Sequence, residues 1–286
     1  MMDFFTKNGS GYYTNRDIYD DNGILLLGKG QRITTDIRNK LQRRGVRIPG
    51  EDEIDNYLKH FASDRRHSDE IISVSQQLKE RINIRDDKLL EKPNEILINI
   101  IFESKNKPWW IYVNALGNYI NWLYTHSIDV ALISLMMAIE LGYGDDELVN
   151  LGIGTLLHDV GKLLVPKYIV QKPGSLTDAE ASVIRQHCEL GISSLENFNL
   201  PKEYTDIVLQ HHERMDGSGY PRGLKGDEIC RNAKIVMIAD TTDSITSFRP
   251  YRQPQQMDAA LKILKEEGEK YPKEYLLLLE SLVAPE

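Results

Sequence analysis

Residues 151–166 read LGIGTLLHDVGKLLVP, and this stretch decides the fold of the second half of the chain. The apolar residues Leu148, Leu151, Leu156 and Leu157 recur at helical spacing, which predicts a helix over Asp145–Leu157. His158 and Asp159 follow at the end of that helix. An imidazole thus lies next to a carboxylate, whose two oxygens can bridge two cations.

Helical periodicity continues on both sides of this stretch. We expect one or two helices over 114–141, a helix opened by a Thr177–Glu180 capping box, a helix after Pro201, and another over 231–247. Four glycines between residues 217 and 226 predict a loop. This half is therefore expected to be entirely α-helical.

The first half looks different. Asp21-Asn22-Gly23 between two apolar runs predicts a β-hairpin over 17–27, and Thr34 or Thr35 is expected to cap a short helix ending near Gly45. Amphipathic helices are expected over 54–85, with an interruption, and over 94–102. The predicted fold class is mostly α, with a C-terminal helical bundle over 106–286 and a small α+β N-terminal domain over 1–105.

Composition restricts the class of protein. The chain has 286 residues, 41% of them hydrophobic, and a net charge of −8, which is typical of a globular protein and disfavours nucleic acid as a partner. Two cysteines make no disulfide framework, and no signal peptide is visible at the N-terminus. The apolar run Val130 to Ile139 is about half of what a membrane span needs. We therefore expect a cytoplasmic protein without membrane insertion.

The histidines indicate a metal site. Five of the seven lie between residues 126 and 212, each in or at the end of an expected helix, and imidazole is the commonest metal ligand at neutral pH. Asp240 lies in an apolar helix, where a carboxylate is costly unless it binds a metal or a buried partner such as a Lys or Arg. Nitrogen and oxygen ligands without thiolate suit iron or manganese, and less specifically zinc. Two such ions would suit phosphodiester hydrolysis, without fixing the substrate.

The motifs resemble a known family. His158-Asp159 followed by VGK is similar to the signature of the HD phosphohydrolase superfamily, and residues 211–221, HHERMDGSGYP, match the HHExxDGxGYP motif of its HD-GYP branch. These elements occur in the family's order over roughly residues 115 to 270. The resemblance implies a helical bundle that hydrolyses cyclic di-GMP with two divalent metal ions, iron or manganese.

The same resemblance implies roles for individual residues. The implied metal ligands are His158, Asp159, His187, His211, His212 and Asp240. Asp159 and Lys162 are the implied catalytic residues, and substrate contacts are expected from Lys162, Tyr220, Arg249 and Arg252. Glu213 and Asp216 are expected to orient imidazoles through their second ring nitrogen, with Asp243 as a further supporting carboxylate behind the ligands.

The chain departs from the family pattern before His126. Some members hold a third metal with the counterpart of His126 and a preceding acidic residue, but residues 117–125, GNYINWLYT, contain no carboxylate and place Trp122 one turn before the histidine. We therefore expect a two-metal centre that opens the ring to linear pGpG, with little further cleavage to GMP. His126 is then a ligand of an outer metal or a phosphate contact.

Two alternatives stay open. The first is a catalytically weak module that binds cyclic di-GMP in the same pocket and signals through the N-terminal half. The second is an enzyme that performs the same hydrolysis on another cyclic dinucleotide. The N-terminal half carries no motif that assigns its role. Its amphipathic helices either form a homodimer or protein-partner surface or pack within the fold.

Overall fold

The computed structural model describes residues 5–8, 11–14, 18–19, 25–28, 30–32, 34, 37, 64–248 and 253–283. The chain divides into two compact units, Met1–Ser63 and Asp64–Glu286. The predicted boundary at residue 105 therefore lies inside the second unit.

The described residues of unit 1 form two antiparallel hairpins. Strand β3 (Ile18–Tyr19) pairs with β4 (Leu25–Leu27), which confirms the strands of the predicted hairpin, although its turn at 21–23 lies outside the described residues. Strand β1 (Phe5–Asn8) pairs with β2 (Gly11–Thr14), a hairpin that the sequence analysis did not anticipate.

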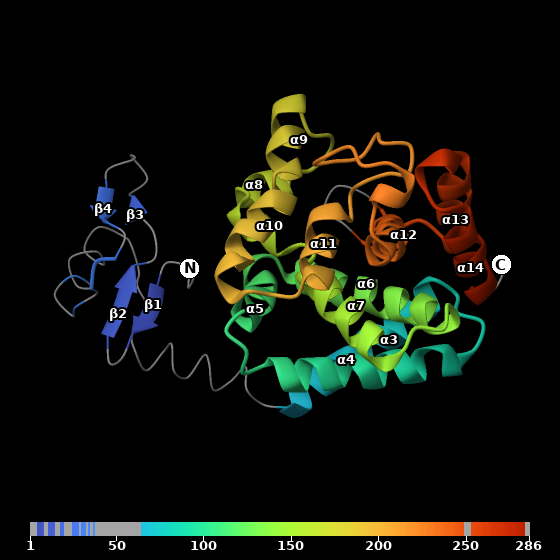
Figure 1. The fold of residues 1–286 in the computed structure, drawn as a ribbon, viewed down its shortest axis with the longest axis horizontal. Coiled ribbons are helices and arrows are strands. Elements are labelled where there is room, and N and C mark those ends of the chain that lie inside the picture. Colours follow the sequence, from blue (N-terminus) through green and yellow to red (C-terminus); the bar gives the residue numbers. More distant parts are fainter. Residues whose placement is uncertain are drawn as a thin grey trace. The chain divides into compact units, whose positions relative to one another are not determined.

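Unit 2 is helical over its described residues, apart from one isolated bridge between Ile84 and Val283. Figure 1 shows its main helices and shorter helical turns in chain order. The α-helices are α3 (Asp64–Arg81), α4 (Glu91–Ser104), α5 (Trp110–Tyr119), α6 (Asn121–Glu140), α7 (Asp145–Leu157), α8 (Lys167–Val170), α9 (Asp178–Arg185), α10 (His187–Leu195), α11 (Lys202–Gln210), α12 (Arg231–Thr246), α13 (Met257–Glu266) and α14 (Lys273–Leu282). The all-helical prediction for this part of the chain is confirmed.

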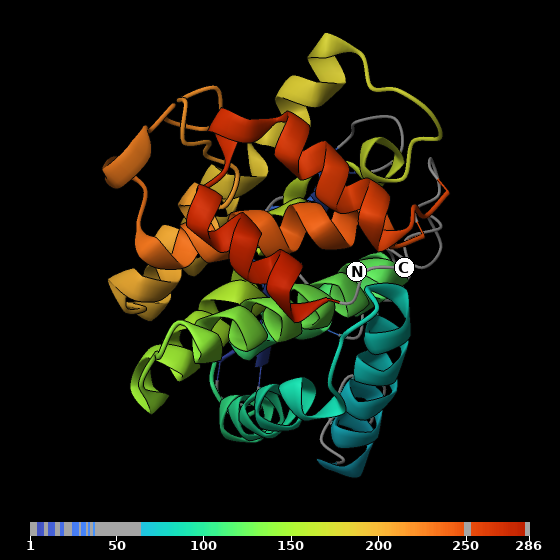
Figure 2. The same cartoon turned by 90° about the vertical axis from the view of Figure 1, so that its right-hand side faces the viewer.

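Helix α6 is the centre of the bundle. It packs against α5, α7 and α12, and Figure 2 shows the green helices α6 and α7 between α3 and α4 on one side and α12 to α14 on the other. Segment Trp122–Glu140 is long and apolar enough to span a membrane, but 83% of its most apolar window is buried inside the unit. This is the pattern of a core helix in a globular fold.

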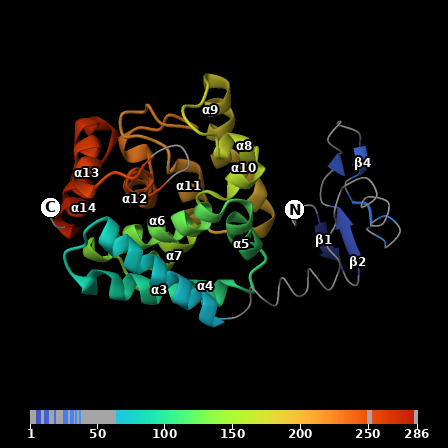
Figure 3. The ribbon, with the colours of Figure 1, turned by 180° about the vertical axis from the view of Figure 1, so that it is seen from behind.

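Helices α3 and α4 belong to this bundle. They pack on each other, and both contact α6, as Figure 3 shows from the opposite side. Fully buried Ile71, Leu78 and Leu97 carry the contact, because their apolar area leaves water only if the two helices lie on the bundle. The amphipathic pattern of α3 and α4 is therefore explained by packing inside unit 2.

Breaks in the backbone separate two pairs of helices. The stretch 114–141, predicted as one or two helices, forms two, because the extended backbone at Ile120 separates α5 from α6. Helix α9 starts with the predicted capping box, in which Thr177 accepts from the Glu180 amide and the Glu180 carboxylate accepts from Thr177. It stops before Gln186, and α10 then begins with His187, so that this histidine lies at a helix start.

Candidate metal centre

The His158-Asp159 pair lies where α7 stops. Helix α7 ends at Leu157 and the chain continues as a 3₁₀ turn, Val160–Leu164. This turn lies directly against α10, since a Cβ on Gly161 would come within 1.8 Å of the His187 carbonyl oxygen. Only glycine permits this approach, and it brings Asp159 next to His187.

Four helices and the 3₁₀ turn bring the five clustered histidines together. Their ring centroids lie 4.9 Å apart for His158 and His211, 5.3 Å for His187 and His211, and 5.2 Å for His126 and His158. His212 lies 4.1 Å from His211 by the same measure. The clustering predicted from the sequence is therefore present in space.

Backbone carbonyls orient three of these rings. His158 Nδ1 lies 2.6 Å from the Thr155 oxygen and His187 Nδ1 lies 2.7 Å from the Ile184 oxygen. His211 Nδ1 lies 3.1 Å from the carbonyl oxygens of the preceding turn. A carbonyl only accepts, so each Nδ1 carries the proton and each Nε2 keeps its lone pair. All three Nε2 atoms face the Asp159 carboxylate, at 3.4 to 3.9 Å.

Asp159 is shared by two groups of metal-ligating atoms, each within 4.8 Å of one another. One group is Asp159 with His187, His211 and His212, and the other is Asp159 with His126 and His158. The shared carboxylate lies where two neighbouring cations can both reach it, one from each group.

The residues present fit divalent metal ions. His158 Nε2 and Asp159 Oδ1 are buried without a hydrogen-bond partner among the described residues, which costs about 1–3 kcal/mol for each atom. His187 Nε2 and His211 Nε2 approach to 3.3 Å with lone pairs facing each other. Cations held by the two groups of residues would satisfy these atoms.

The electrostatics favour metal-binding protonation states. Burial lowers the pKa of His158, His211 and His212, and lowers the pKa of His187 to about 4. Burial alone would raise the pKa of Asp159, but Lys162 and the surrounding histidines hold this pKa well below its usual range. Neutral imidazoles and an ionised carboxylate are the forms that bind metals.

Lys162, implied by the resemblance as a catalytic residue, points into the same site. It lies in the 3₁₀ turn, three residues after Asp159. Its Nζ lies 2.5 Å from Asp159 Oδ2 and its side chain is 15% exposed. The ammonium thus lies at the edge of the cluster, where solvent and a phosphate oxygen can reach it.

The Gly-rich loop carries Tyr220 onto the histidines. The Tyr220 ring stacks on His212, with centroids 4.7 Å apart and planes at 27°, and the Tyr220–Pro221 bond is cis. Arg185, from the end of α9, lies with its guanidinium carbon 5.7 Å from the Tyr220 ring centre. Arg185 is absent from the residues predicted from the sequence, although its position two residues before His187 could have indicated it.

The expected roles of Glu213 and Asp216 are corrected. The buried Glu213 carboxylate accepts hydrogen bonds from the amides of Arg222 and Leu224, and Asp216 accepts from the amide and hydroxyl of Ser218. Both carboxylates therefore shape the loop that carries Tyr220. They do not orient the rings of His158, His187 and His211, because backbone carbonyls already accept from the Nδ1 atoms of those three histidines.

His126 lies inside the cluster rather than at its margin. Its Nε2 is 3.1 Å from Asp240 Oδ1 and 3.5 Å from Asp159 Oδ2, and its Nδ1 is 2.6 Å from Asp243 Oδ2. Burial raises the pKa of Asp240, but the hydrogen bond with His126 and nearby His212 hold it well below its usual range. Arg249 and Arg252, expected to contact substrate, lie outside the described residues.

Cys188 follows His187 and is fully buried. Its Sγ lies 3.6 Å from His187 Nε2, and burial raises the pKa of the thiol well above its usual value. A buried thiol with a raised pKa behaves as a small apolar side chain.

The comparison with protein families agrees with this geometry. The family model described as HD domain matches residues 110–274, which is more than half of the chain, so the chain belongs to the HD domain family. Its 211–221 motif and its relatives identify it as a member of the HD-GYP branch.

Curated relatives match the helical unit. The chain is 38% identical over 141 residues to a cyclic di-GMP phosphodiesterase of Thermotoga maritima, a match covering 49% of this chain and 38% of that protein. It is 40% identical over 131 residues to the cyclic di-GMP phosphodiesterase response regulator RpfG of Xanthomonas campestris (45% and 35%). It is 38% identical over 141 residues to 3'3'-cGAMP-specific phosphodiesterase 3 of Vibrio cholerae (49% and 31%). The chain thus spans less than two fifths of these relatives.

A solved structure shares the fold. Bd1817, an HDG"Y"P protein from Bdellovibrio bacteriovorus, is similar with a TM-score of 0.53 over 93% of this chain and 92% of that one, at 19% identity. At this identity the likeness concerns the fold alone.

Proposed function

We propose that this chain is a metal-dependent cyclic dinucleotide phosphodiesterase whose substrate is cyclic di-GMP. The observation that carries the proposal is Asp159, a buried carboxylate shared by two groups of convergent histidines. The names of the relatives from Thermotoga and Xanthomonas support cyclic di-GMP, and the name of the Vibrio relative supports a neighbouring substrate, 3'3'-cGAMP.

Two divalent ions, iron or manganese, suit the donor set because it contains imidazole and carboxylate without thiolate. The proposed ligands are His126, His158, Asp159, His187, His211, His212 and Asp240. When bound, the ions would supply Lewis-acid polarisation of the phosphodiester and acidify the attacking water.

The side chains of the protein perform the remaining tasks. Lys162 has its ammonium on Asp159 and is partly exposed, so it can hold a phosphate oxygen while it balances the carboxylate. Tyr220, stacked on His212, offers a ring face and a hydroxyl for the base or ribose of the substrate. Arg185 adds a cation beside that ring, and Arg249 and Arg252 are proposed to bind the second phosphate.

We propose two ions rather than three. Trp122 occupies the helical position one turn before His126, where the third-metal members of the family have an acidic residue. An indole offers no ligand oxygen to a metal ion. The expected product is therefore linear pGpG, with slow or no conversion to GMP.

The test is hydrolysis by anaerobically prepared protein loaded with Fe²⁺ or Mn²⁺, with products separated by HPLC. We expect pGpG to accumulate from cyclic di-GMP and to disappear in Asp159→Asn, whereas Asp227→Asn, a change at an exposed carboxylate paired with Lys234, retains activity. Full activity in Asp159→Asn would refute the metal mechanism, and rapid formation of GMP would refute the two-metal reading.

The same assay tests the alternatives. Parallel reactions with 3'3'-cGAMP compare the two substrates by kcat/KM. Calorimetry with intact cyclic di-GMP on metal-loaded protein tests the sensor, which would bind nucleotide without turnover. We propose no partner for the N-terminal half, because α3 and α4, the helices from which a homodimer or protein-partner surface was expected, pack within unit 2.

A further inference from the structure

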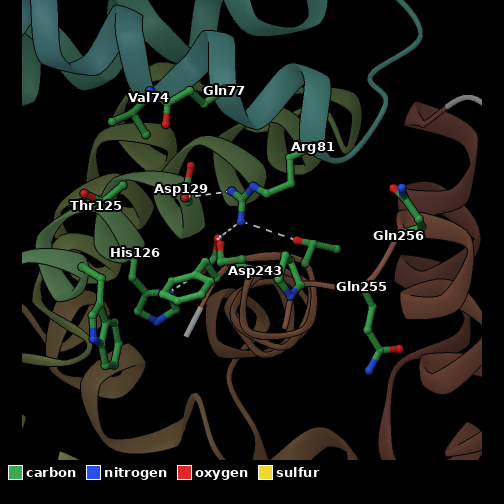
Figure 4. Close-up of a pocket in the computed structure, with 14 residues that line it drawn as sticks. Val74, Gln77, Arg81, Thr125, His126, Asp129, Asp243, Gln255 and Gln256 are labelled. Carbon is green, nitrogen blue, oxygen red and sulfur yellow. Dashed lines mark hydrogen bonds and ion pairs between the residues drawn. The ribbon is translucent and has the colours of Figure 1, made fainter. Parts of the chain in front are cut away.

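Helix α3 ends at Arg81, whose guanidinium lies between carboxylates of two other helices. Nη2 is 2.7 Å from Asp129 Oδ2 on α6, and Nη1 is 2.6 Å from Asp243 Oδ1 on α12. Figure 4 shows the guanidinium between the two acids, with Gln255 and Gln256 on the far side of the adjoining cavity of about 540 Å³. One planar fork thus ties α3, α6 and α12 together.

Asp243 connects this fork to the candidate metal centre. Its Oδ1 accepts from Arg81 and from the Ser247 hydroxyl at 2.6 Å, and its Oδ2 lies 2.6 Å from His126 Nδ1. The carboxylate is fully buried and both of its oxygens are engaged, so its rotation is fixed. Because Asp243 holds Nδ1, the other ring nitrogen of His126 faces Asp240 and Asp159.

The charges agree with a directing role for Arg81. Burial, followed by the neighbouring Asp243, raises the pKa of Asp129 well above its usual value and favours its protonated form. Asp243 is fully buried and its Oδ1 lies 2.6 Å from Arg81 Nη1, so Arg81 balances the charge of this carboxylate directly. A carboxylate that accepts from one ring nitrogen of a histidine, and is itself held by a guanidinium, fixes the orientation in which the other ring nitrogen can bind a metal.

We propose that Arg81 is a positioning residue of the metal centre, which orients His126 through Asp243. The inference rests on the proposed function, because it takes His126 as a metal ligand. It also assigns a role to α3, a helix that the sequence analysis placed in the N-terminal domain and that follows unit 1 directly in the chain.

The test is calorimetric titration of metal-free protein with Mn²⁺, which reports stoichiometry and affinity without any turnover. We expect Arg81→Gln to weaken one of the bound ions about 10- to 100-fold, the range for loss of a group that holds a ligand. The matched control is Arg85→Gln, four residues beyond the end of α3, where the guanidinium donates to the Val283 carbonyl at 2.7 Å. This control is expected to stay within about twofold of the unchanged chain.

A second pair of variants separates position from charge. Asp129→Asn imitates the protonated acid and is expected to preserve Mn²⁺ binding. Arg81→Lys keeps the charge, but its single ammonium does not span both carboxylates, so we expect weaker binding here as well. Arg81→Lys also serves as the test if Arg81→Gln does not fold.

The outcomes are distinguishable. Unchanged Mn²⁺ affinity in the folded Arg81 variant, or equal weakening in Arg85→Gln, overturns the inference and leaves the proposed function standing. An unaltered chain that binds no Mn²⁺ overturns the proposed function, and the inference with it.

Discussion

Metal binding should stabilise unit 2 by an amount that depends on Asp159. In the metal-free fold, His158 Nε2 and Asp159 Oδ1 are buried without hydrogen bonds to other described residues, at a cost of about 1–3 kcal/mol each. Bound ions would remove this cost. Mn²⁺ at one hundred times its Kd stabilises the folded state by about 2.7 kcal/mol, a value within the cost that the two atoms carry.

The expected shift in Tm follows from the size of the unit. Unit 2 spans Asp64–Glu286, and for a domain of this size 1 kcal/mol corresponds to about 2–4 °C. Mn²⁺ should therefore raise Tm by about 5–11 °C. Asp159→Asn removes the ligand shared by both groups, so its affinity should fall at least a hundredfold, and the same Mn²⁺ concentration should raise its Tm by only about 1–2 °C.

The assay is a thermal melt of each variant in EDTA and in Mn²⁺, with the shift taken relative to the metal-free form of the same variant. Asp227→Asn is the control, because it removes an exposed carboxylate and should keep the full shift. A shift of the same size in Asp159→Asn would refute the reasoning, as would the absence of any shift in the unaltered chain.

Three further predictions concern acid, packing and substrate. The pKa of His187 is about 4 in the folded chain and about 6.5 in the unfolded chain. The free energy of unfolding of the metal-free protein should therefore fall by roughly 3 kcal/mol as the pH drops from 6.5 to 4. Urea denaturation midpoints that do not change over this pH range would contradict the prediction. Gly161→Ala should lower the free energy of unfolding by about 1–3 kcal/mol in urea denaturation, because its Cβ would clash with the backbone of α10. Gly144→Ala should lower it by less than about 1 kcal/mol, because its Cβ would contact no backbone atom. Tyr220→Ala should raise KM about 5- to 100-fold in steady-state kinetics, whereas Tyr220→Phe, which keeps the ring on His212, should not.

The sequence predicted the helices because their signals are local. The Thr177–Glu180 box and the apolar spacing before His158 both act within a few residues, and the structure contains the helices they indicate. The boundary predicted at residue 105 differs from the division after Ser63, because the amphipathic pattern of a helix such as α3 shows that one face is buried but not which element covers it. Only the tertiary structure shows that α3 and α4 pack on α6.

The candidate site also has a part that local sequence predicts and a part that depends on tertiary contacts. Candidate imidazole ligands could be named from an ordered motif, and the structure brings the five histidines together. What the motif could not show is what each carboxylate faces, since this depends on contacts between distant segments. Glu213 adjoins His212 in sequence, yet it binds loop amides, while Asp243 reaches His126 from 117 positions away.

The net charge of −8 and the charges at the candidate site both bear on phosphate binding. An acidic protein repels polyanions. In the metal-free site, two ionised carboxylates, Asp159 and Asp240, face the ammonium of Lys162. The neutral histidines change nothing in this balance, so a phosphate would meet net negative charge there. The two divalent ions proposed here would reverse the sign of the charge locally. Their field would be screened beyond about 10 Å, so the rest of the acidic surface would still repel polyanions. Nucleotide affinity should therefore depend on prior metal loading, and calorimetry with cyclic di-GMP in EDTA should detect no binding.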